Sequence, residues 1–203
     1  MQKCDKFVSF ALLYEKVTGR NQQMVKDGFS LYQEVDYFFN FLYHEDSRPS
    51  NEYKNKKARS LDDKAKKREI QKYFRQLPYH PHSEDWRLER TEYIQKVLDA
   101  NHISKLTMTE VKCVLSRLHC LCSYPINRTK IPNNNSISDI RNAWTELLES
   151  DDIDGILINK TKDAIRFFGE SSICELLAWY YPDNYPMMNL NSESGMRFFG
   201  IDV

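Results

Sequence analysis

Glycine is scarce in this chain, with only six copies in 203 residues, whereas tyrosine and phenylalanine occur twelve and eleven times. β-Barrels, β-sandwiches and phosphate-binding loops need many glycines, because their tight turns use backbone conformations that other residues avoid. Alternating apolar and polar residues, the pattern typical of half-buried strands, are nearly absent. The sequence therefore argues against these classes and favours a helical protein.

The short motifs of common enzyme active sites are also missing, since the chain has no GxxxxGK[ST], GxSxG or HExxH sequence. Asp99, Glu110 and Lys112 are spaced as in metal-dependent nucleases, but those enzymes carry such residues on β-strands around a divalent ion. Residues 151–155 resemble a calcium loop, yet Thr161 stands where that loop needs a bidentate glutamate. We therefore expect no catalytic site, no cofactor and no metal.

Long apolar runs are absent, so no segment reaches the length that spans a bilayer. The N-terminus carries charges throughout and lacks the apolar core of a signal peptide. Of the five scattered cysteines, Cys113 and Cys120 share a helix face but would lie roughly 10 Å apart, too far for one zinc ion. We expect reduced thiols, a cytoplasmic location and no membrane partner.

What the chain does contain is a succession of apolar residues at helical spacing, most of them introduced by a capping residue. These patterns predict an all-α, multi-helix globular bundle of one or two helical subdomains, covering residues 1–125 and 136–203. We expect loops at 47–60 and 125–136. The expected helices are 4–17, 29–44, Ser60 to Leu77, one after Ser83, one after the capping box Thr107-Met-Thr-Glu110, one after Ser136, 152–168 ending at Gly169, one from Ser172 to Pro182, and a short last helix ending at Gly200.

Charge is distributed unevenly, although the formal net charge of the chain is zero. The segment from Arg48 to Arg75 contains eleven basic and four acidic residues, whereas the segment from Asp139 to the end contains twelve acidic and five basic residues. A binding partner of one charge sign would therefore meet different surfaces at the two ends of the chain.

The basic segment supplies the candidate nucleic-acid-binding residues. At 100° per residue, the cations of the helix at 60–77 cluster on the face opposite its apolar residues. Several cations on one rigid face, with further cations on a loop before it, suit a phosphate backbone. The alternative is an ordinary solvated helix surface. The candidates are Lys54, Lys56, Lys57 and Arg59 on the loop, and Lys64, Lys67, Arg68, Lys72 and Arg75 on the helix.

A C-terminal passage, SSICELLAWYYPDNYPMMN at residues 171–189, continues to MRFFG at residues 196–200. It resembles a segment in the N-terminal regions of McrB-like proteins, the nucleotide-hydrolysing subunits of modification-dependent restriction systems. In those proteins an apolar helix runs into a proline-containing turn, and a short helix ending in Leu-Gly follows. The matching residues are Leu176, Leu177, Pro182, Asp183, Tyr185, Pro186, Met188, Asn189 and Gly200.

The resemblance implies a non-catalytic module of a restriction or anti-phage defence protein, because the matched segment holds no catalytic group and lies upstream of the motor domain. Such a module would bind DNA and connect to a downstream ATPase or nuclease. The alternative is a protein–protein adaptor or structural module, in which charge polarity drives docking. An enzyme with a site of dispersed residues is a third hypothesis. We also expect Trp179 and Tyr185 to be largely buried.

Overall fold

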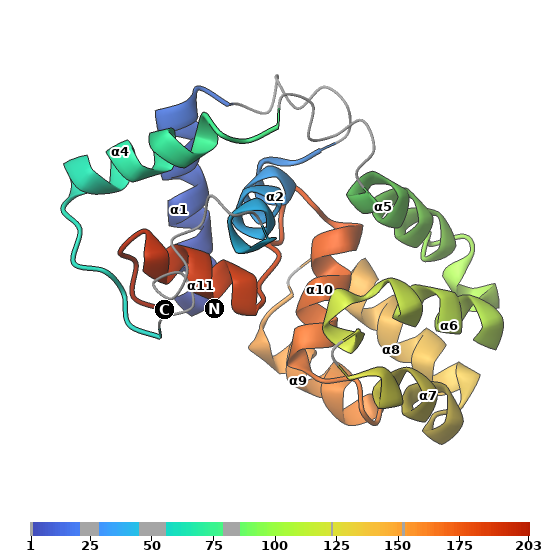
Figure 1. The fold of residues 1–203 in the computed structure, drawn as a ribbon. Helices are drawn as coiled ribbons and strands as arrows, with labels where there is room; N and C mark the ends of the chain where they lie inside the picture. Colours follow the sequence, from blue (N-terminus) through green and yellow to red (C-terminus); the bar gives the residue numbers. More distant parts are fainter. Residues whose placement is uncertain (1, 21–28, 45–55, 79–85, 123, 152) are drawn as a thin grey trace. The chain divides into compact units, whose positions relative to one another are not determined.

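The chain is predominantly helical in the part that the computed structural model describes, namely residues 2–20, 29–44, 56–78, 86–122, 124–151 and 153–203. No strand occurs in these ranges, so the expected all-α fold is confirmed (Figure 1). The helices are α1 (Gln2–Thr18), α2 (Leu31–His44), α4 (Asp63–Phe74), α5 (Trp86–Val97), α6 (Met108–Arg117), α7 (Pro125–Asn134), α8 (Ile137–Glu149), α9 (Gly155–Ala164), α10 (Glu170–Tyr180) and α11 (Leu190–Phe198), with short 3-10 turns η1 (Ile103–Lys105) and η2 (His119–Leu121).

Capping side chains begin several helices where the sequence predicts them. At the start of α6 the Thr107 hydroxyl accepts a hydrogen bond from the Glu110 amide at 3.3 Å. The Glu110 carboxylate in turn accepts one from the Thr107 amide at 2.7 Å, which completes the predicted capping box. Ser136 caps α8 by accepting from the Asp139 amide at 3.1 Å. The caps fix these boundaries because they satisfy amides that have no partner inside the helix.

The basic helix begins later than expected. Asp62, not Ser60, is the N-cap of α4, and its carboxylate accepts a hydrogen bond from the Ala65 amide at 2.7 Å. Aspartate is as good a capping residue as serine, and its charge also favours the positive end of the helix dipole. The helix ends at Phe74 and not at Leu77. The cap expected at Ser83 lies outside the described residues.

The loop expected at 125–136 is wrong, because most of this segment is helix α7. Pro125 occupies the first turn, where its missing amide hydrogen costs no helical bond. Ile131 and Pro132 are buried. The asparagines that suggested a loop cap the end of the helix. The side-chain amide of Asn134 donates to the Lys130 carbonyl at 2.8 Å, and that of Asn135 donates to the Ile131 carbonyl at 2.7 Å.

The helix expected over 152–168 is too long at both ends. Asp154 caps α9 by accepting from the Leu157 amide at 2.8 Å, and the helix stops at Ala164. Gly169, expected to end this helix, is instead the N-cap of α10. The helix from Ser172 therefore begins two residues early, at Glu170. A separate turn joins α9 to α10.

The chain divides into two compact units, which do not coincide with the regions expected at 1–125 and 136–203. The first unit consists of residues 1–88 and 182–203, and the second of residues 89–181. In the first unit α2 and α4 pack on α1, and α11 packs on both α1 and α2. The C-terminal segment therefore belongs with the N-terminal helices, which helix spacing alone does not reveal.

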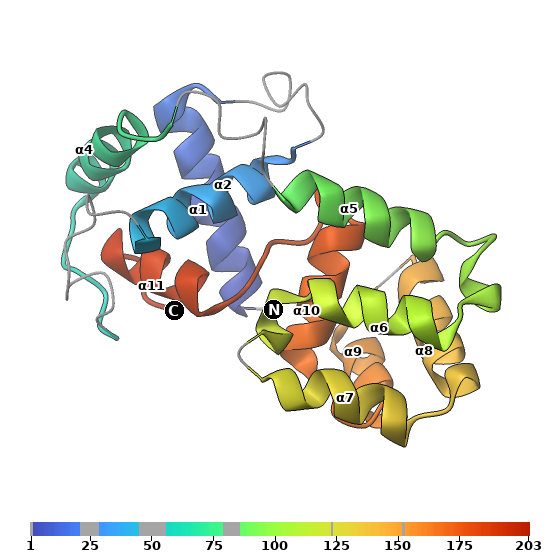
Figure 2. The ribbon, with the colours of Figure 1, turned by 45° about the vertical axis from the view of Figure 1, so that its right-hand side comes forward.

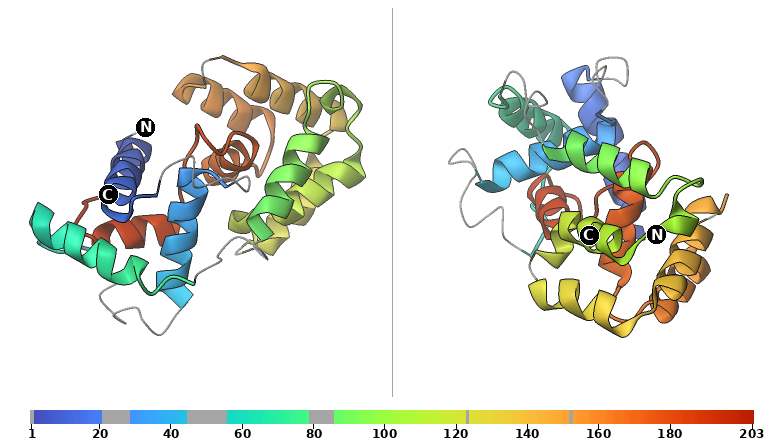
Figure 3. Two further views of the ribbon diagram at one scale, coloured as in Figure 1. Left: turned by 90° about the horizontal axis from the view of Figure 1, so that it is seen from above. Right: turned by 90° about the vertical axis from the view of Figure 1, so that its right-hand side faces the viewer.

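The second unit is built from one continuous segment. Helix α8 packs on α9, α9 packs on α10, and α6 packs on α7, as two further views show (Figure 2 and Figure 3). Trp179 of α10 is buried, as expected, with 1% of its surface exposed. Tyr185, which belongs to the first unit, is partly buried, less completely than Trp179.

Candidate nucleic-acid interface

Helix α4 rests on the aromatic core of the first unit. Ile70 and Tyr73 are buried, and the Tyr73 ring meets the Phe198 ring edge-on at a centroid distance of 5.6 Å. The Phe74 ring contacts Tyr14 of α1 in the same way at 5.8 Å. These contacts fix the rotation of α4 about its axis, because the apolar residues at positions 70, 73 and 74 form one face.

The opposite face of α4 is cationic. Lys64, Lys67, Arg68, Lys72 and Arg75 are all exposed. With a rise of 1.5 Å per residue, positions 64 to 75 extend about 16 Å along the helix axis, and the cations recur about once per turn. We call these five residues the α4 basic face.

Most of the basic face has no internal counter-charge. Lys64, Lys67, Arg68 and Arg75 form no ion pair with any other described residue. The Lys72 ammonium lies 4.9 Å from the centroid of the neighbouring Tyr73 ring. These cations therefore remain available to an external anion.

Arg59, a predicted phosphate contact, is engaged within the fold. Its guanidinium lies 4.5 Å above the Phe198 ring, donates to the Phe198 carbonyl at 3.3 Å and lies 3.6 Å from the Glu69 carboxylate. Its backbone amide donates to the Arg197 carbonyl at 3.1 Å. These contacts attach the segment before α4 to α11.

The other three candidates on the loop before α4 are Lys54, Lys56 and Lys57. Lys56 and Lys57 are exposed, whereas Lys54 lies outside the described residues.

Gln71, which we did not predict, is exposed between the cations of α4. Its spacing of seven residues from Lys64 and four from Lys67 places it on the same face. That spacing was visible in the sequence, but a search for cations alone does not find a glutamine.

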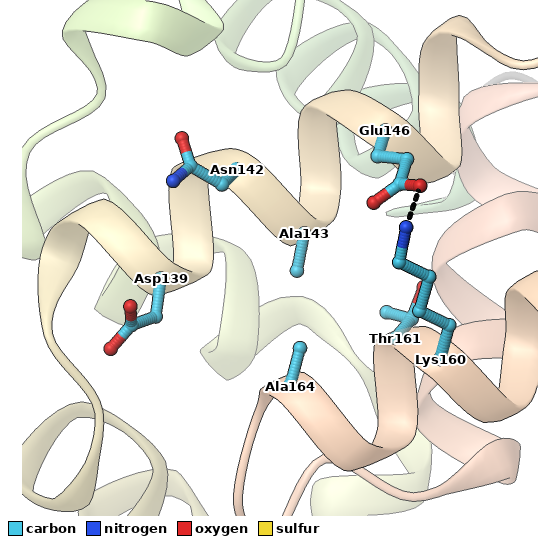
Figure 4. A pocket seen from close by; sticks show the side chains of 7 residues that line it. All are labelled: Asp139, Asn142, Ala143, Glu146, Lys160, Thr161 and Ala164. Carbon is cyan, nitrogen blue, oxygen red and sulfur yellow. Dashed lines mark hydrogen bonds and ion pairs between the residues drawn. The ribbon is translucent and has the colours of Figure 1, made fainter.

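A shallow pocket of about 240 Å³ lies between α8 and α9 of the second unit (Figure 4). Glu146 and Lys160 form an ion pair at one side of it, so each neutralises the other. The remaining polar side chains are Asp139, Asn142 and Thr161, so Asp139 is the only lining carboxylate outside the ion pair. The pocket therefore does not point to a reaction.

Two other residues considered for chemistry, Glu110 and Cys120, have structural partners. Glu110, of the nuclease-like spacing, is held by Thr107 and also lies 2.8 Å from His102 Nε2. Burial, together with the nearby Glu175 carboxylate, raises the pKa of the Cys120 thiol to about 12, which disfavours its nucleophilic thiolate form. Among the described residues no group of three or more His, Cys, Asp or Glu side chains is placed to hold a metal ion.

None of the helices in the described ranges combines the length and the apolar character needed to cross a membrane. Comparison with known proteins finds no matching family, no matching curated protein and no matching solved structure. The similarity to McrB-like proteins therefore remains a prediction from the C-terminal passage.

Proposed function

We propose that this chain is a non-catalytic DNA-binding module that contacts phosphate groups through the α4 basic face. One observation carries the proposal: Lys64, Lys67, Arg68 and Arg75 are exposed on one rigid face and form no ion pair with any described residue. Side chains of this length reach successive phosphates, and their cations gain affinity by releasing the counterions of the nucleic acid.

The composition of the basic face favours backbone contacts over base recognition. Gln71 is the only amide that we place among its cations, and the helix contributes its aromatic residues to the core. Phosphate contacts position a protein on DNA but carry no direct sequence information. The proposed binding is therefore largely independent of sequence. Lys56 and Lys57 on the preceding segment supplement it.

The C-terminal passage supports a more specific setting for this binding. In McrB-like proteins a similar segment precedes a nucleotide-hydrolysing domain. We propose that the chain serves as a target-binding module of a restriction or anti-phage defence system and connects to an ATPase or nuclease effector. This setting rests on the resemblance alone.

The test compares two charge-reversed variants that change the net charge equally. The first replaces Lys64, Lys67, Arg68 and Arg75 by Glu. The matched control replaces four exposed lysines of the second unit by Glu, namely Lys96, Lys105, Lys112 and Lys162. Binding of labelled duplex DNA is measured for both variants and for the parent at several salt concentrations, and circular dichroism checks that each variant is folded.

We expect the parent affinity to fall steeply with salt, the α4 variant to lose binding and the control to retain most of it. Each phosphate contact contributes a slope of about 0.9 logarithmic units per decade of salt, so any residual binding after the loss of four contacts should depend on salt less steeply, by about 3.6. Equal binding by the parent and the α4 variant would rule out this interface. The adaptor hypothesis, with protein docking in place of DNA binding, would then be the better explanation.

A further inference from the structure

The turn between α9 and α10 holds a phenylalanine in an unfavourable backbone conformation. The Phe168 amide donates to the Ile165 carbonyl at 3.2 Å, which closes a four-residue turn. Phe167, the third residue of that turn, has a φ of +69°, the left-handed region. Turns of this kind normally carry glycine or asparagine at the third position, because a β-carbon is strained there.

Neighbouring residues hold this turn from both sides. Asn135, just after α7, pairs with the backbone of Arg166: its side-chain oxygen accepts from the Arg166 amide at 2.8 Å, and its amide donates to the Arg166 carbonyl at 3.1 Å. Ile165 and Phe168 are buried, with 0% and 1% of their surface exposed. The surrounding structure therefore fixes the turn at Arg166 and at the buried Ile165 and Phe168. The Phe167 side chain, between Arg166 and Phe168, is left exposed.

The Phe167 ring is 45% exposed, although an aromatic residue normally gains stability by burial. Phe167 therefore carries the backbone strain of the turn but buries little of its own side chain in the core. Strain that persists because the surrounding structure imposes it is concentrated at functional sites in proteins. The exposed ring is therefore a candidate contact with a ligand.

Two cations lie next to the ring. The Lys130 ammonium of α7 lies 5.1 Å from the ring centroid, and the exposed Arg166 directly precedes Phe167. Residues 111–138 contain no acidic residue, although the second unit as a whole contains slightly more acidic than basic residues. An exposed aromatic ring with flanking cations matches the requirements of an unpaired nucleobase, which stacks on the ring while its phosphates meet the cations.

We propose that Phe167 is a stacking platform for an unpaired base of a single-stranded nucleic acid, with Lys130 and Arg166 binding the adjacent phosphates. Lys130 is exposed, so its ammonium can leave the ring face for a phosphate when a base stacks. The site is separate from the α4 basic face and does not depend on it. It differs in selectivity, because a duplex keeps its bases paired and cannot supply one to the ring.

Three substitutions at position 167 separate stacking from other roles of the side chain. Phe167→Leu keeps an apolar side chain but removes the aromatic face. Phe167→Tyr keeps the aromatic ring. Phe167→Gly removes the side chain and relieves the positive φ. The probes are single-stranded oligothymidylate and a duplex of the same length, and binding is measured by fluorescence anisotropy at low salt.

We expect Phe167→Leu to weaken oligothymidylate binding by about tenfold, the order of magnitude for one stacked base, and Phe167→Tyr to preserve it. Duplex binding should be unchanged in both variants. Phe167→Gly should also bind oligothymidylate weakly, yet melt at a higher temperature than the parent. A purely structural role of Phe167 would instead lower the melting temperature of the glycine variant.

Three results would overturn the stacking site. They are undetectable oligothymidylate binding by the parent, equal oligothymidylate binding by the parent and Phe167→Leu, and equal losses on single strand and duplex in Phe167→Leu. The first or second result would favour a protein partner for the exposed ring. The α4 basic face has its own test, which uses duplex DNA and substitutions in the first unit.

Discussion

The core of the first unit consists mainly of aromatic rings, whereas that of the second consists mainly of leucine, isoleucine and valine side chains. In the first unit Phe199, near the C-terminus, packs on Phe10 and Phe38 at centroid distances of 5.4 and 5.6 Å. Aromatic side chains bury large areas, and here they join segments that lie far apart in the sequence. The second unit, built from one continuous segment, needs only Trp144, Trp179 and Phe168 among its buried residues of this kind.

The two units also differ in how they accommodate buried charge. In the first unit the Arg87 guanidinium donates to Asp36 Oδ2 from two nitrogens, at 2.9 and 2.8 Å, and both side chains are almost fully buried. In the second unit the buried Glu175 carboxylate accepts from the Cys120 amide at 2.7 Å and from the Trp179 indole at 3.1 Å. The buried carboxylate of Asp36 in the first unit is therefore stabilised by a charged guanidinium. The buried carboxylate of Glu175 in the second unit is stabilised by a backbone amide and a neutral indole.

The largest effect should come from breaking the buried pair of the first unit. Asp36→Ala leaves the Arg87 guanidinium buried without its counter-charge, and such losses cost about 3–5 kcal/mol. The free energy of unfolding, from urea titration, measures this cost. The double variant Asp36→Leu with Arg87→Met should be less destabilised, because no charge remains buried. A double variant as unstable as Asp36→Ala would show that packing, not charge, explains the loss.

A matched pair of glycines tests how tightly each unit is packed. A β-carbon at Gly195 would lie 2.2 Å from the Phe39 ring, whereas one at Gly155 of the second unit would meet no atom within 4 Å. Gly195→Ala should therefore destabilise the protein by about 1–3 kcal/mol through overpacking. Gly155→Ala should stabilise it by up to about 1 kcal/mol, because alanine restricts the unfolded chain.

Amide hydrogen exchange would localise these two effects. Gly195→Ala should accelerate exchange in α2 and α11, and Gly155→Ala should leave those helices unchanged. Equal melting temperatures for the parent and Gly195→Ala would mean that α11 shifts away from Phe39 at little cost.

The contrast between the two units also explains which features of the fold could be predicted from the sequence. Local signals were sufficient in the second unit at two helix starts marked by a polar cap, Thr107 and Ser136. They failed at α7, because asparagines that cap a helix have the same composition as a loop. The pairing of residues 182–203 with the N-terminal helices depends on contacts between distant rings, which no local pattern encodes.

The candidate site shows the same limits. The exposure of the α4 cations followed from helical spacing, since Ile70 and Tyr73 had to be buried. The engagement of Arg59 by Phe198 could not be predicted, because these residues are far apart in sequence. Phe167 was also missed, since a long helix expected over 152–168 left no turn in which a positive φ could arise.

A smaller effect should follow from removing a cap in the second unit. Thr107→Ala removes the hydroxyl that accepts from the Glu110 amide, and comparable losses cost about 1 kcal/mol. Thr107→Ser keeps the hydroxyl and should retain most of the stability. A denaturation midpoint for Thr107→Ala equal to that of the parent would show that water replaces the cap at no cost.

The smallest effects should be pH-dependent and of opposite sign in the two units. In the second unit hydrogen bonds from the Thr107 backbone and side chain, with His102 nearby, lower the pKa of Glu110 from 4.5 to about 2. The stability that Glu110 contributes is therefore present above pH 4.5 and is lost as the pH falls toward 2.

In the first unit burial raises the pKa of Glu34, against the opposing influence of Arg20 and Tyr14. Because folding then favours protonated Glu34, its contribution to stability should increase as the pH falls toward and below that raised pKa.

Thermal melts of the parent, Glu110→Gln and Glu34→Gln between neutral and acidic pH would measure both contributions. The difference between the parent and Glu110→Gln should shrink as the pH falls from 4.5 to 2, because protonated Glu110 resembles glutamine. The parent should gain stability on acidification relative to Glu34→Gln, whose side chain does not titrate. A constant difference between the parent and either variant would mean that the ionisation of that carboxyl group is not linked to folding. The two stability differences, parent against Glu110→Gln and parent against Glu34→Gln, should change with pH in opposite directions. A change in the same direction would contradict the contrast between Glu110, whose ionised form is held by hydrogen bonds, and Glu34, whose ionised form is opposed by burial.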